Sequence, residues 1–234
     1  MTTPFQDRRQ AGRELAAAVG GLEMQRPIVL ALPRGGVPVA EEVARMLDAP
    51  LDLVIVRKVG APDNAELAVA AIVDGNPPDV VLNREIVEAY GLDDAALEAL
   101  IRRERPELER RRHAYLGKRK PLSVTGRTAV LVDDGAATGV TMKAAVRALK
   151  RRSPGEIVVA IPVAPPDTVS EFEQEADRVV CLRRPARFHA LGFHYLRFPQ
   201  VTDEEVVAAL ALARSRIRTA GASDSTRRPA GSTR

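Results

Sequence analysis

The chain has 234 residues, 45% hydrophobic and 28% charged, which is long enough to bury a full core without disulfides or a structural metal. Its one cysteine, Cys181, excludes an internal disulfide, and no apolar run approaches the roughly 20 residues of a membrane span. The net charge of +4 is local, because residues 213–234 hold six arginines and one acid. The nearly neutral body therefore argues against nucleic acid or a membrane surface as the main partner.

The N-terminal segment MTTPFQDRRQAGR lacks the apolar core of a secretory signal, so we expect a cytoplasmic protein. Asp7 is placed to cap the first helix. The next elements alternate in the strand–turn–helix–strand order of a parallel sheet, and two short strands separated by a Gly-Asn-Pro-Pro turn follow. The predicted elements are a helix to about residue 19, a strand over 28–32, a helix over 39–47, a strand over 51–56, and short strands over 67–74 and 79–83.

The second half continues the alternation after two helices. The longer of these helices is heavily charged and contains Pro106, which is expected to kink or interrupt it. Residues from about Thr219 onward have no apolar periodicity and are predicted to be disordered. The predicted elements are helices over 85–90 and 93–116, a strand over 128–132, a helix over 141–152, a strand over 156–163, a helix over 168–175, a strand over 178–182, and a final helix from Thr202 to about Leu212.

The stretch VLVDDGAATGVTM over residues 130–142 carries the most specific chemistry. An apolar strand ends in Asp133 and Asp134, and a loop of small residues then opens onto a helix. Backbone N–H groups at such a helix start favour a phosphate, and two hydroxyl side chains add donors. The carboxylates suit vicinal sugar hydroxyls or hydrated Mg²⁺. A phosphate at one end and a diol at the other describe a ribose 5-phosphate.

Other nucleotide motifs fit this stretch less well. A Walker loop needs a lysine after its last glycine, and none follows Gly139. The G-x-G-x-x-G fingerprint of dinucleotide-binding proteins is absent from the stretch. A nucleotide-binding oxidoreductase therefore has only the fold class in its favour.

The same stretch resembles the phosphoribosylpyrophosphate (PRPP) motif of type I phosphoribosyltransferases, and the resemblance covers most of residues 5–212. It is closest to a bacterial group of phosphoribosyltransferases whose acceptor is generally not established. The resemblance implies that Asp133 and Asp134 hold the ribose hydroxyls, and a metal through water or PRPP. It also implies that five loop residues cradle the 5-phosphate: Ala137, Thr138, Gly139, Val140 and Thr141.

Two further segments fit a pyrophosphate group. Arg34, Gly35 and Gly36 follow a strand, where glycine permits close approach of the backbone and arginine supplies a bidentate phosphate donor. A simple turn is the alternative explanation. Arg57 and Lys58 follow the second predicted strand, and the resemblance places basic residues there against the pyrophosphate. A solvated basic pair explains them equally well.

The acceptor is less well defined. The 6-oxopurine enzymes of the family carry a carboxylate at the position of Ala137, so alanine argues against hypoxanthine–guanine specificity. Phe188, Phe193 and Tyr195 fall where the family places a hood over the base, and rings could stack there on a planar acceptor. A small hydrophobic cluster that anchors a loop is an equally good explanation.

The prediction is an α/β protein: a Rossmann-like, parallel-sheet phosphoribosyltransferase domain over residues 1–212, with a disordered basic tail over 219–234. The domain has an inserted hairpin and helix segment over about 60–118 and a hood over 183–212. The expected reaction is Mg-dependent transfer of phosphoribosyl from PRPP to a nitrogenous base, with Asp133, Asp134, Arg34 and Lys58 as the catalytic residues. No membrane or nucleic acid is expected as a partner, and a homodimer stays open.

The alternative function is a non-catalytic PRPP sensor that binds RNA or a protein. The basic tract over residues 102–120, with nine basic and three acidic residues, is what an RNA would contact. A solvated helix face is the simpler explanation of that tract, because it contains a single aromatic residue, Tyr115.

Overall fold

The computed structural model describes residues 3–65, 67–75 and 77–225. Its centre is a five-stranded, all-parallel sheet in the order β2-β1-β6-β7-β8, which confirms the predicted α/β class. Four of these strands are almost wholly buried because helices cover both faces, as parallel sheets require, whereas the edge strand β8 is half-buried. The strands are β1 Ile28–Ala31, β2 Leu51–Leu53, β6 Thr128–Val132, β7 Glu156–Val163 and β8 Arg178–Arg183.

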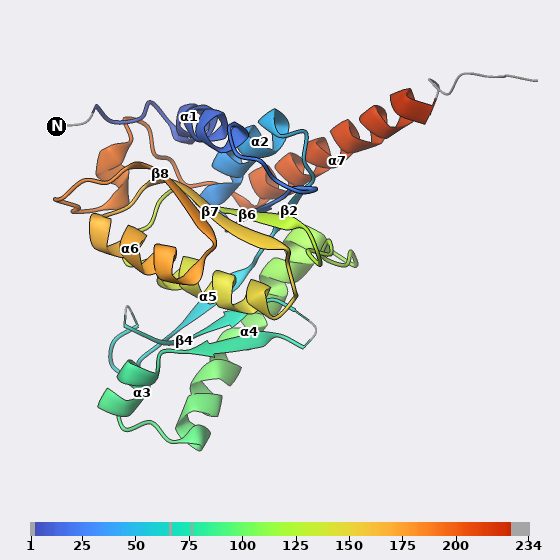
Figure 1. Ribbon diagram of the computed structural model, residues 1–234. Helices are drawn as coiled ribbons and strands as arrows, with labels where there is room; N and C mark the ends of the chain where they lie inside the picture. Colours follow the sequence, from blue (N-terminus) through green and yellow to red (C-terminus); the bar gives the residue numbers. More distant parts are fainter. Residues whose placement is uncertain (1–2, 66, 76, 226–234) are drawn as a thin grey trace, which may run out of the picture.

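Helices form a layer on each side of this sheet (Figure 1). One layer contains α1, α2 and α7, and the other contains α5 and α6. Asp7 caps α1 by accepting a hydrogen bond from the N–H of Gln10, as predicted. The helices are α1 Arg8–Gly20, α2 Gly36–Met46, α5 Val140–Lys150, α6 Pro166–Glu175 and α7 Asp203–Ser225, with a short 3₁₀ helix, η1, at Leu191–His194.

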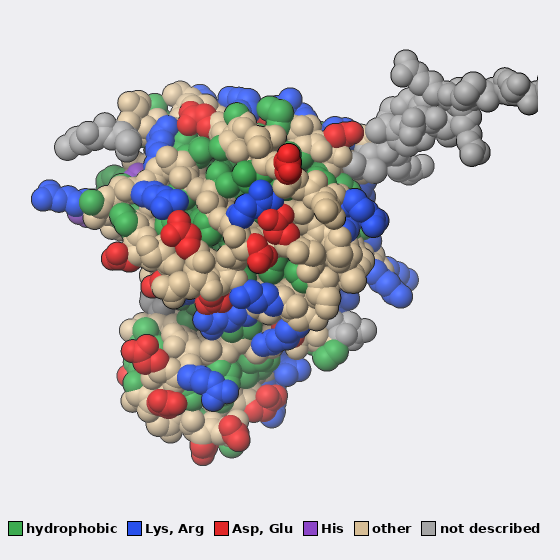
Figure 2. Space-filling model, in the orientation of Figure 1, with side chains coloured by type: hydrophobic (Ala, Val, Ile, Leu, Met, Phe, Trp, Pro, Cys, Tyr) green, Lys and Arg blue, Asp and Glu red, His purple; other side chains and the backbone are tan. Residues whose placement is uncertain are grey.

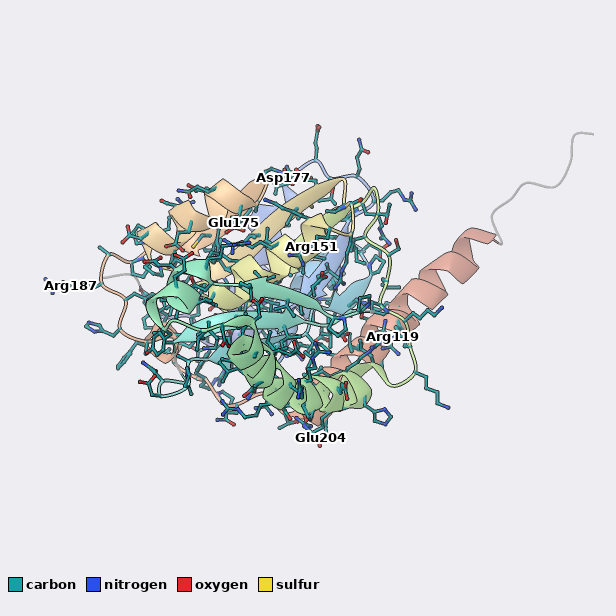
Figure 3. All side chains as sticks on the ribbon, turned by 90° about the horizontal axis from the view of Figure 1, so that it is seen from below. Arg119, Arg151, Glu175, Asp177, Arg187 and Glu204 are labelled. Atoms are coloured by element: carbon teal, nitrogen blue, oxygen red, sulfur yellow. The ribbon has the colours of Figure 1, made fainter. Side chains whose placement is uncertain are left out.

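A second unit is built on a three-stranded antiparallel sheet in the order β3-β4-β5, and it packs against α5. Seen from below in Figure 3, α4 crosses this sheet on the side away from α5. The sequence predicted a kink or an interruption at Pro106. The helix α4 is instead continuous through this residue. Pro106 is exposed, so water can reach the carbonyl that the missing N–H would have bonded. The elements are β3 Val56–Gly60, β4 Ala68–Val73, β5 Asp79–Leu82, α3 Arg84–Ala89 and α4 Asp94–Leu116.

The predicted strand over residues 51–56 is in fact two strands in different sheets. Val54 N–H still bonds to Ala31 of the parallel sheet, whereas the carbonyl of Ile55 accepts from Asp74 beside the antiparallel sheet. The apolar run is continuous across this change of sheet, because every residue from Leu51 to Val56 is buried on both sides of it. Hydrophobicity alone could therefore not locate the break.

The last helix is longer than predicted. It runs through residues 219–225, which were predicted to be disordered, and its final turns extend away from the sheet (Figure 1). Alanine and arginine over residues 213–218 favour a helix by intrinsic propensity and carry it past Leu212, whereas residues 219–225 hold no arginine and two alanines and give no such signal. The remainder of the predicted tail, residues 226–234, lies outside the described residues.

The basic tract over 102–120 is largely paired within the protein. Arg110 and Arg111 form salt bridges with Glu107. Nε of Arg112 lies 3.6 Å from Oδ1 of Asp74, and Nη2 of Arg119 lies 2.7 Å from Oδ1 of Asp52. On the face drawn in Figure 2, basic and acidic side chains are interspersed. Within the described ranges, no helix is long and apolar enough to cross a membrane.

Candidate functional site

Two loops meet at the carboxyl edge of the parallel sheet. The strands β1 and β6 are neighbours, and the N–H of Leu32, the residue after β1, bonds to the carbonyl of Val132, the last residue of β6. The loop after β1 therefore lies against the paired carboxylates. A Cβ on Gly36 would lie 2.9 Å from the Cα of Asp133, so only glycine fits there. The structure thus brings together the Arg34–Gly36 loop, whose Pro33–Arg34 peptide is cis, and the Asp133–Asp134 pair.

The second loop, residues 137–141, leads into the first turn of α5. Ala137 and Thr138 are exposed, and Gly139 is the N-cap with φ +66° and no side chain to cap the helix. The first N–H groups of the helix therefore have no partner within the helix, which is the arrangement that suits an anion. Thr168 of α6 donates a 2.7 Å hydrogen bond to the carbonyl of Ala137 and fixes the loop.

The two carboxylates have different surroundings. Asp134 is buried, and its Oδ2 accepts a 2.7 Å hydrogen bond from Nε of Arg8, which is itself buried in α1. Asp133 is partly exposed and accepts a 2.9 Å bond from the N–H of Asp134. Arg8 neutralises Asp134 directly and Asp133 only from a distance. Burial and the neighbouring charge of Asp134 together raise the pKa of Asp133 well above its ordinary value.

This raised pKa predicts a stability cost at the site. An acid whose pKa is raised in the folded protein destabilises the fold once it ionises, so the stabilising contribution lies at low pH. Asp133→Asn should therefore raise the melting temperature at pH 7, and its advantage over the natural chain should shrink as the pH falls toward about 4. Asp48→Asn is the control, because Asp48 is exposed in a turn at φ +46°, which asparagine tolerates. A pH-independent difference for Asp133→Asn would contradict this explanation.

The cations predicted to bind a pyrophosphate do not all lie at the carboxyl edge of the parallel sheet. Arg34 is exposed, and its Nη1 lies 3.5 Å from Oδ1 of Asp203 at the start of α7. Arg57 and Lys58 were predicted to follow a strand of the parallel sheet. They lie instead within β3 of the antiparallel sheet. Arg57 Nε donates a 2.8 Å hydrogen bond to Glu104 of α4. Lys58, on the opposite face of the strand, is exposed.

The three aromatic residues of the predicted hood differ in exposure. Tyr195 is buried, and the centre of its ring lies 4.9 Å from that of Phe198 and 5.5 Å from that of Phe5. It therefore offers no open face for stacking. Phe188 is half-buried against His194. Phe193 alone of the three predicted rings is largely exposed, at 75%. The structure therefore supports the loop-anchoring cluster for Tyr195 and Phe188 and leaves Phe193 available to a ligand.

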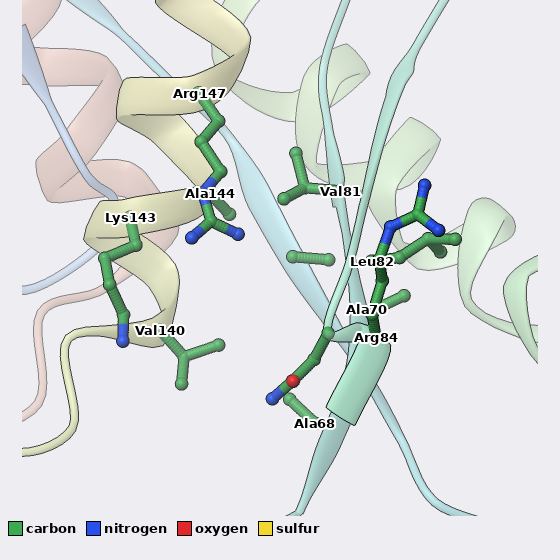
Figure 4. Close-up of a pocket in the computed structure, with 11 residues that line it drawn as sticks. Ala68, Ala70, Val81, Leu82, Arg84, Val140, Lys143, Ala144 and Arg147 are labelled. Atoms are coloured by element: carbon green, nitrogen blue, oxygen red, sulfur yellow. The ribbon is translucent and has the colours of Figure 1, made fainter. Parts of the chain in front are cut away.

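A cavity of about 350 Å³ adjoins the loop over residues 137–141, between α5 and the antiparallel sheet (Figure 4). Val140 links the cavity to that loop, and alanines of β4 form part of its opposite wall. Lys143 and Arg147 extend into it from α5, but both are ion-paired with acids of α6. The cavity thus widens the site on one side without adding uncompensated charge from α5.

Sequence reasoning missed Arg8 and Asp203. Arg8 follows a capping aspartate at a helix start, and Asp203 is a first-turn acid, so each has an ordinary local explanation. Nothing in the spacing of the chain links Arg8 to Asp134, which lies 126 residues away in the sequence. Only the fold brings these groups to the carboxylates and to Arg34.

Comparison with known proteins agrees with this geometry. A family model described as the phosphoribosyl transferase domain matches residues 5–196. Two Mycobacterium tuberculosis proteins, "Putative phosphoribosyl transferase Rv0571c" of strain H37Rv and its MT0597 counterpart of strain CDC 1551, are 46% identical over 96% of this chain. The chain spans 50% of the length of each of these relatives.

A solved structure also shares the fold. The crystal structure of TT1426 from Thermus thermophilus is 45% identical, with a TM-score of 0.76 over 89% of this chain and 98% of that one. The matched range of the family model spans the Arg34–Gly36 loop, the paired carboxylates and the 5-phosphate loop. The chain therefore belongs to the phosphoribosyl transferase domain family.

Proposed function

We propose that the chain transfers 5-phosphoribosyl from PRPP to a nitrogenous base, with Mg²⁺, and releases pyrophosphate. The observation that carries this proposal is the meeting of three groups at one sheet edge. These groups are a helix start suited to phosphate, the carboxylate of Asp133, and a glycine loop with Arg34. Their order matches the order of 5-phosphate, ribose diol and pyrophosphate in PRPP.

Each part of PRPP then has a partner. The loop of Ala137, Thr138, Gly139, Val140 and Thr141 takes the 5-phosphate. Asp133 accepts hydrogen bonds from the ribose hydroxyls. The backbone at Gly35 and Gly36 and the side chains of Arg34 and Lys58 take the pyrophosphate. Arg57 is committed to Glu104, so we assign it to holding β3 against α4.

The residues present fit a metal that arrives with its substrate. Among the described residues, no cluster of three or more His, Cys, Asp and Glu side chains could hold an ion alone. Asp133 is the carboxylate whose charge Arg8 does not pair directly, and Asp134 stands next to it. Mg²⁺ would supply electrostatic stabilisation of the leaving pyrophosphate, with oxygens of PRPP completing its coordination.

The chemistry needs positioning rather than a protein nucleophile. As the bond between ribose C1 and the pyrophosphate oxygen breaks, positive charge develops on the sugar, and the carboxylate of Asp133 favours it. Negative charge develops on the leaving group, and Arg34 and Lys58 favour that charge. The acceptor nitrogen bonds to C1. Ala137 offers no carboxylate to the acceptor, and Phe193 is the exposed ring of the hood.

Isothermal titration of Mg-PRPP tests the assignment. Asp133→Asn should weaken binding by about 100-fold, because a charged acceptor of the ribose hydroxyls is lost. Asp48 is an exposed aspartate beyond the C-terminal end of α2, whose N-terminal end is at Gly36, so Asp48→Asn should bind like the natural chain. Equal binding by Asp133→Asn and Asp48→Asn would refute the site.

A pyrophosphate-release screen with PRPP and a panel of purines, pyrimidines and related heterocycles then separates transfer from sensing. Release that depends on one base identifies the acceptor. PRPP binding without release by any base would establish the sensor instead. RNA as the partner of such a sensor finds little support, because much of the basic tract is paired internally.

A further inference from the structure

Arg8 is the most heavily engaged cation near the site. It is 8% exposed, and its Nε donates to Oδ2 of Asp134 at 2.7 Å. Its Nη1 donates to the carbonyl of Pro199 at 2.6 Å, and its guanidinium lies 3.7 Å from the centre of the Phe198 ring. One side chain of α1 thus contacts both the loop that holds Asp133 and Asp134 and the segment that follows η1.

Asp134 in turn joins three parts of the chain. Its carboxylate lies directly over the pyrophosphate loop, since a Cβ on Gly35 would lie 2.2 Å from Oδ2. Its backbone carbonyl accepts a hydrogen bond from the hydroxyl of Tyr195. The pair of Arg8 and Asp134 is therefore the point at which the pyrophosphate loop, the carboxylate loop and the hood are held together.

The adjacent carboxylates of Asp133 and Asp134 therefore have different roles. Asp134 has its charge compensated by a buried arginine at hydrogen-bond distance, and its position is fixed by that bond. Asp133 forms no comparable ion pair with a cation of the described residues, and it keeps some exposure. A ligand hydroxyl gains most from the carboxylate that is not already engaged.

We propose that Arg8 is a positioning residue of the transfer site: through Asp134 it sets the relation of the pyrophosphate loop and the hood to the carboxylate loop, and it leaves Asp133 as the acid that meets the ribose. This inference rests on the proposed function for its ligand. It changes the role of Asp134, which was expected to share the diol with Asp133, to that of an anchor.

Two readouts on four proteins test the proposal: the natural chain, Arg8→Gln, Asp134→Asn and the double variant. Hydrogen exchange of residues 33–37 and 191–199 reports whether the loops are held, and it needs no ligand. Isothermal titration of Mg-PRPP measures the affinity of the site for its ligand. Arg102→Gln is the control, because Arg102 is exposed on α4 and forms no ion pair with a described residue.

Arg8→Gln should speed exchange in both segments and weaken Mg-PRPP binding by at least about tenfold, since small displacements of positioning groups are costly. The double variant leaves no unpaired buried charge, so its exchange should be slower than that of Arg8→Gln. It still lacks the bond between Arg8 and Asp134, so exchange should stay faster, and Mg-PRPP binding weaker, than in the natural chain. Arg102→Gln should match the natural chain in both readouts.

Three results would overturn the proposal. Unchanged exchange in Arg8→Gln would show that Arg8 does not hold the loops. Faster exchange with undiminished PRPP binding would make Arg8 merely structural. A double variant that binds PRPP as poorly as Asp134→Asn, with exchange recovered, would make Asp134 a direct ligand. If the natural chain binds no PRPP, the proposed function fails, while the exchange data still decide whether Arg8 positions the loops.

Discussion

Gly139→Ala is expected to lower the free energy of unfolding by about 2–5 kcal/mol and to abolish measurable Mg-PRPP binding. Gly139 has φ +66°, where an added Cβ costs about 1–2 kcal/mol in backbone strain. The same Cβ would lie 2.6 Å from a ring carbon of Phe172, a fully buried side chain of α6. Because that ring is enclosed in the core, relieving the overlap must move the loop that starts α5.

Gly91→Ala is the matched control for Gly139→Ala. Gly91 has nearly the same backbone angle, φ +57°, but nothing within 4 Å of its added Cβ. It should show the backbone strain alone, about 1–2 kcal/mol, with PRPP binding unchanged. Urea denaturation and isothermal titration measure the two effects. Similar losses in both variants would mean that contact with Phe172 does not define the loop.

Arg119→Ala is expected to lower the free energy of unfolding by about 3 kcal/mol, because it leaves a buried charge unpaired. Asp52 in β2 is 1% exposed and accepts from Arg119 Nη2 at 2.7 Å and from Leu122 N–H at 2.7 Å. This pair pins the segment after α4 back onto the parallel sheet. Figure 3 shows Arg119 close to α7, where the chain returns from the antiparallel unit.

A double-variant cycle separates the charge from the packing. Asp52→Asn keeps an acceptor for Leu122 and removes the charge, so Arg119→Ala/Asp52→Asn should be more stable than Arg119→Ala alone. Lys118→Ala, at the exposed neighbouring position, should change stability by less than about 0.5 kcal/mol. A double variant no more stable than Arg119→Ala would show that the charge of Asp52 is not the cause. Urea denaturation of the natural chain, the two single variants, the double variant and Lys118→Ala measures these differences.

Most of the fold could be predicted because its signals are local. Asp7 is a cap that acts on the N–H three residues later, and the buried strands of the parallel sheet are short apolar runs bounded by turn residues. Two of the errors lie where no local signal exists. The chain changes sheets inside a uniformly buried run, and α7 continues through residues 219–225, which lack apolar periodicity.

The part of the candidate site that lies within one segment of the chain could also be predicted. Residues 130–142 combine strand, carboxylates, small-residue loop and helix start within one segment, so their mutual geometry follows from the chain itself. The role of Arg57 could not be predicted, because its partner Glu104 comes from a distant helix. The burial of Tyr195 depends on Phe5 at the other end of the chain.

The sequence by itself determined the fold class, the loop that suits a phosphate and the pair of carboxylates beside it. Those features depend on neighbours along the chain, where residue type and spacing fix the geometry. The tertiary structure alone decided which carboxylate is ion-paired, since Arg8 reaches Asp134 across 126 residues. A desolvated ion pair depends on which groups burial brings together, and no local pattern records that choice.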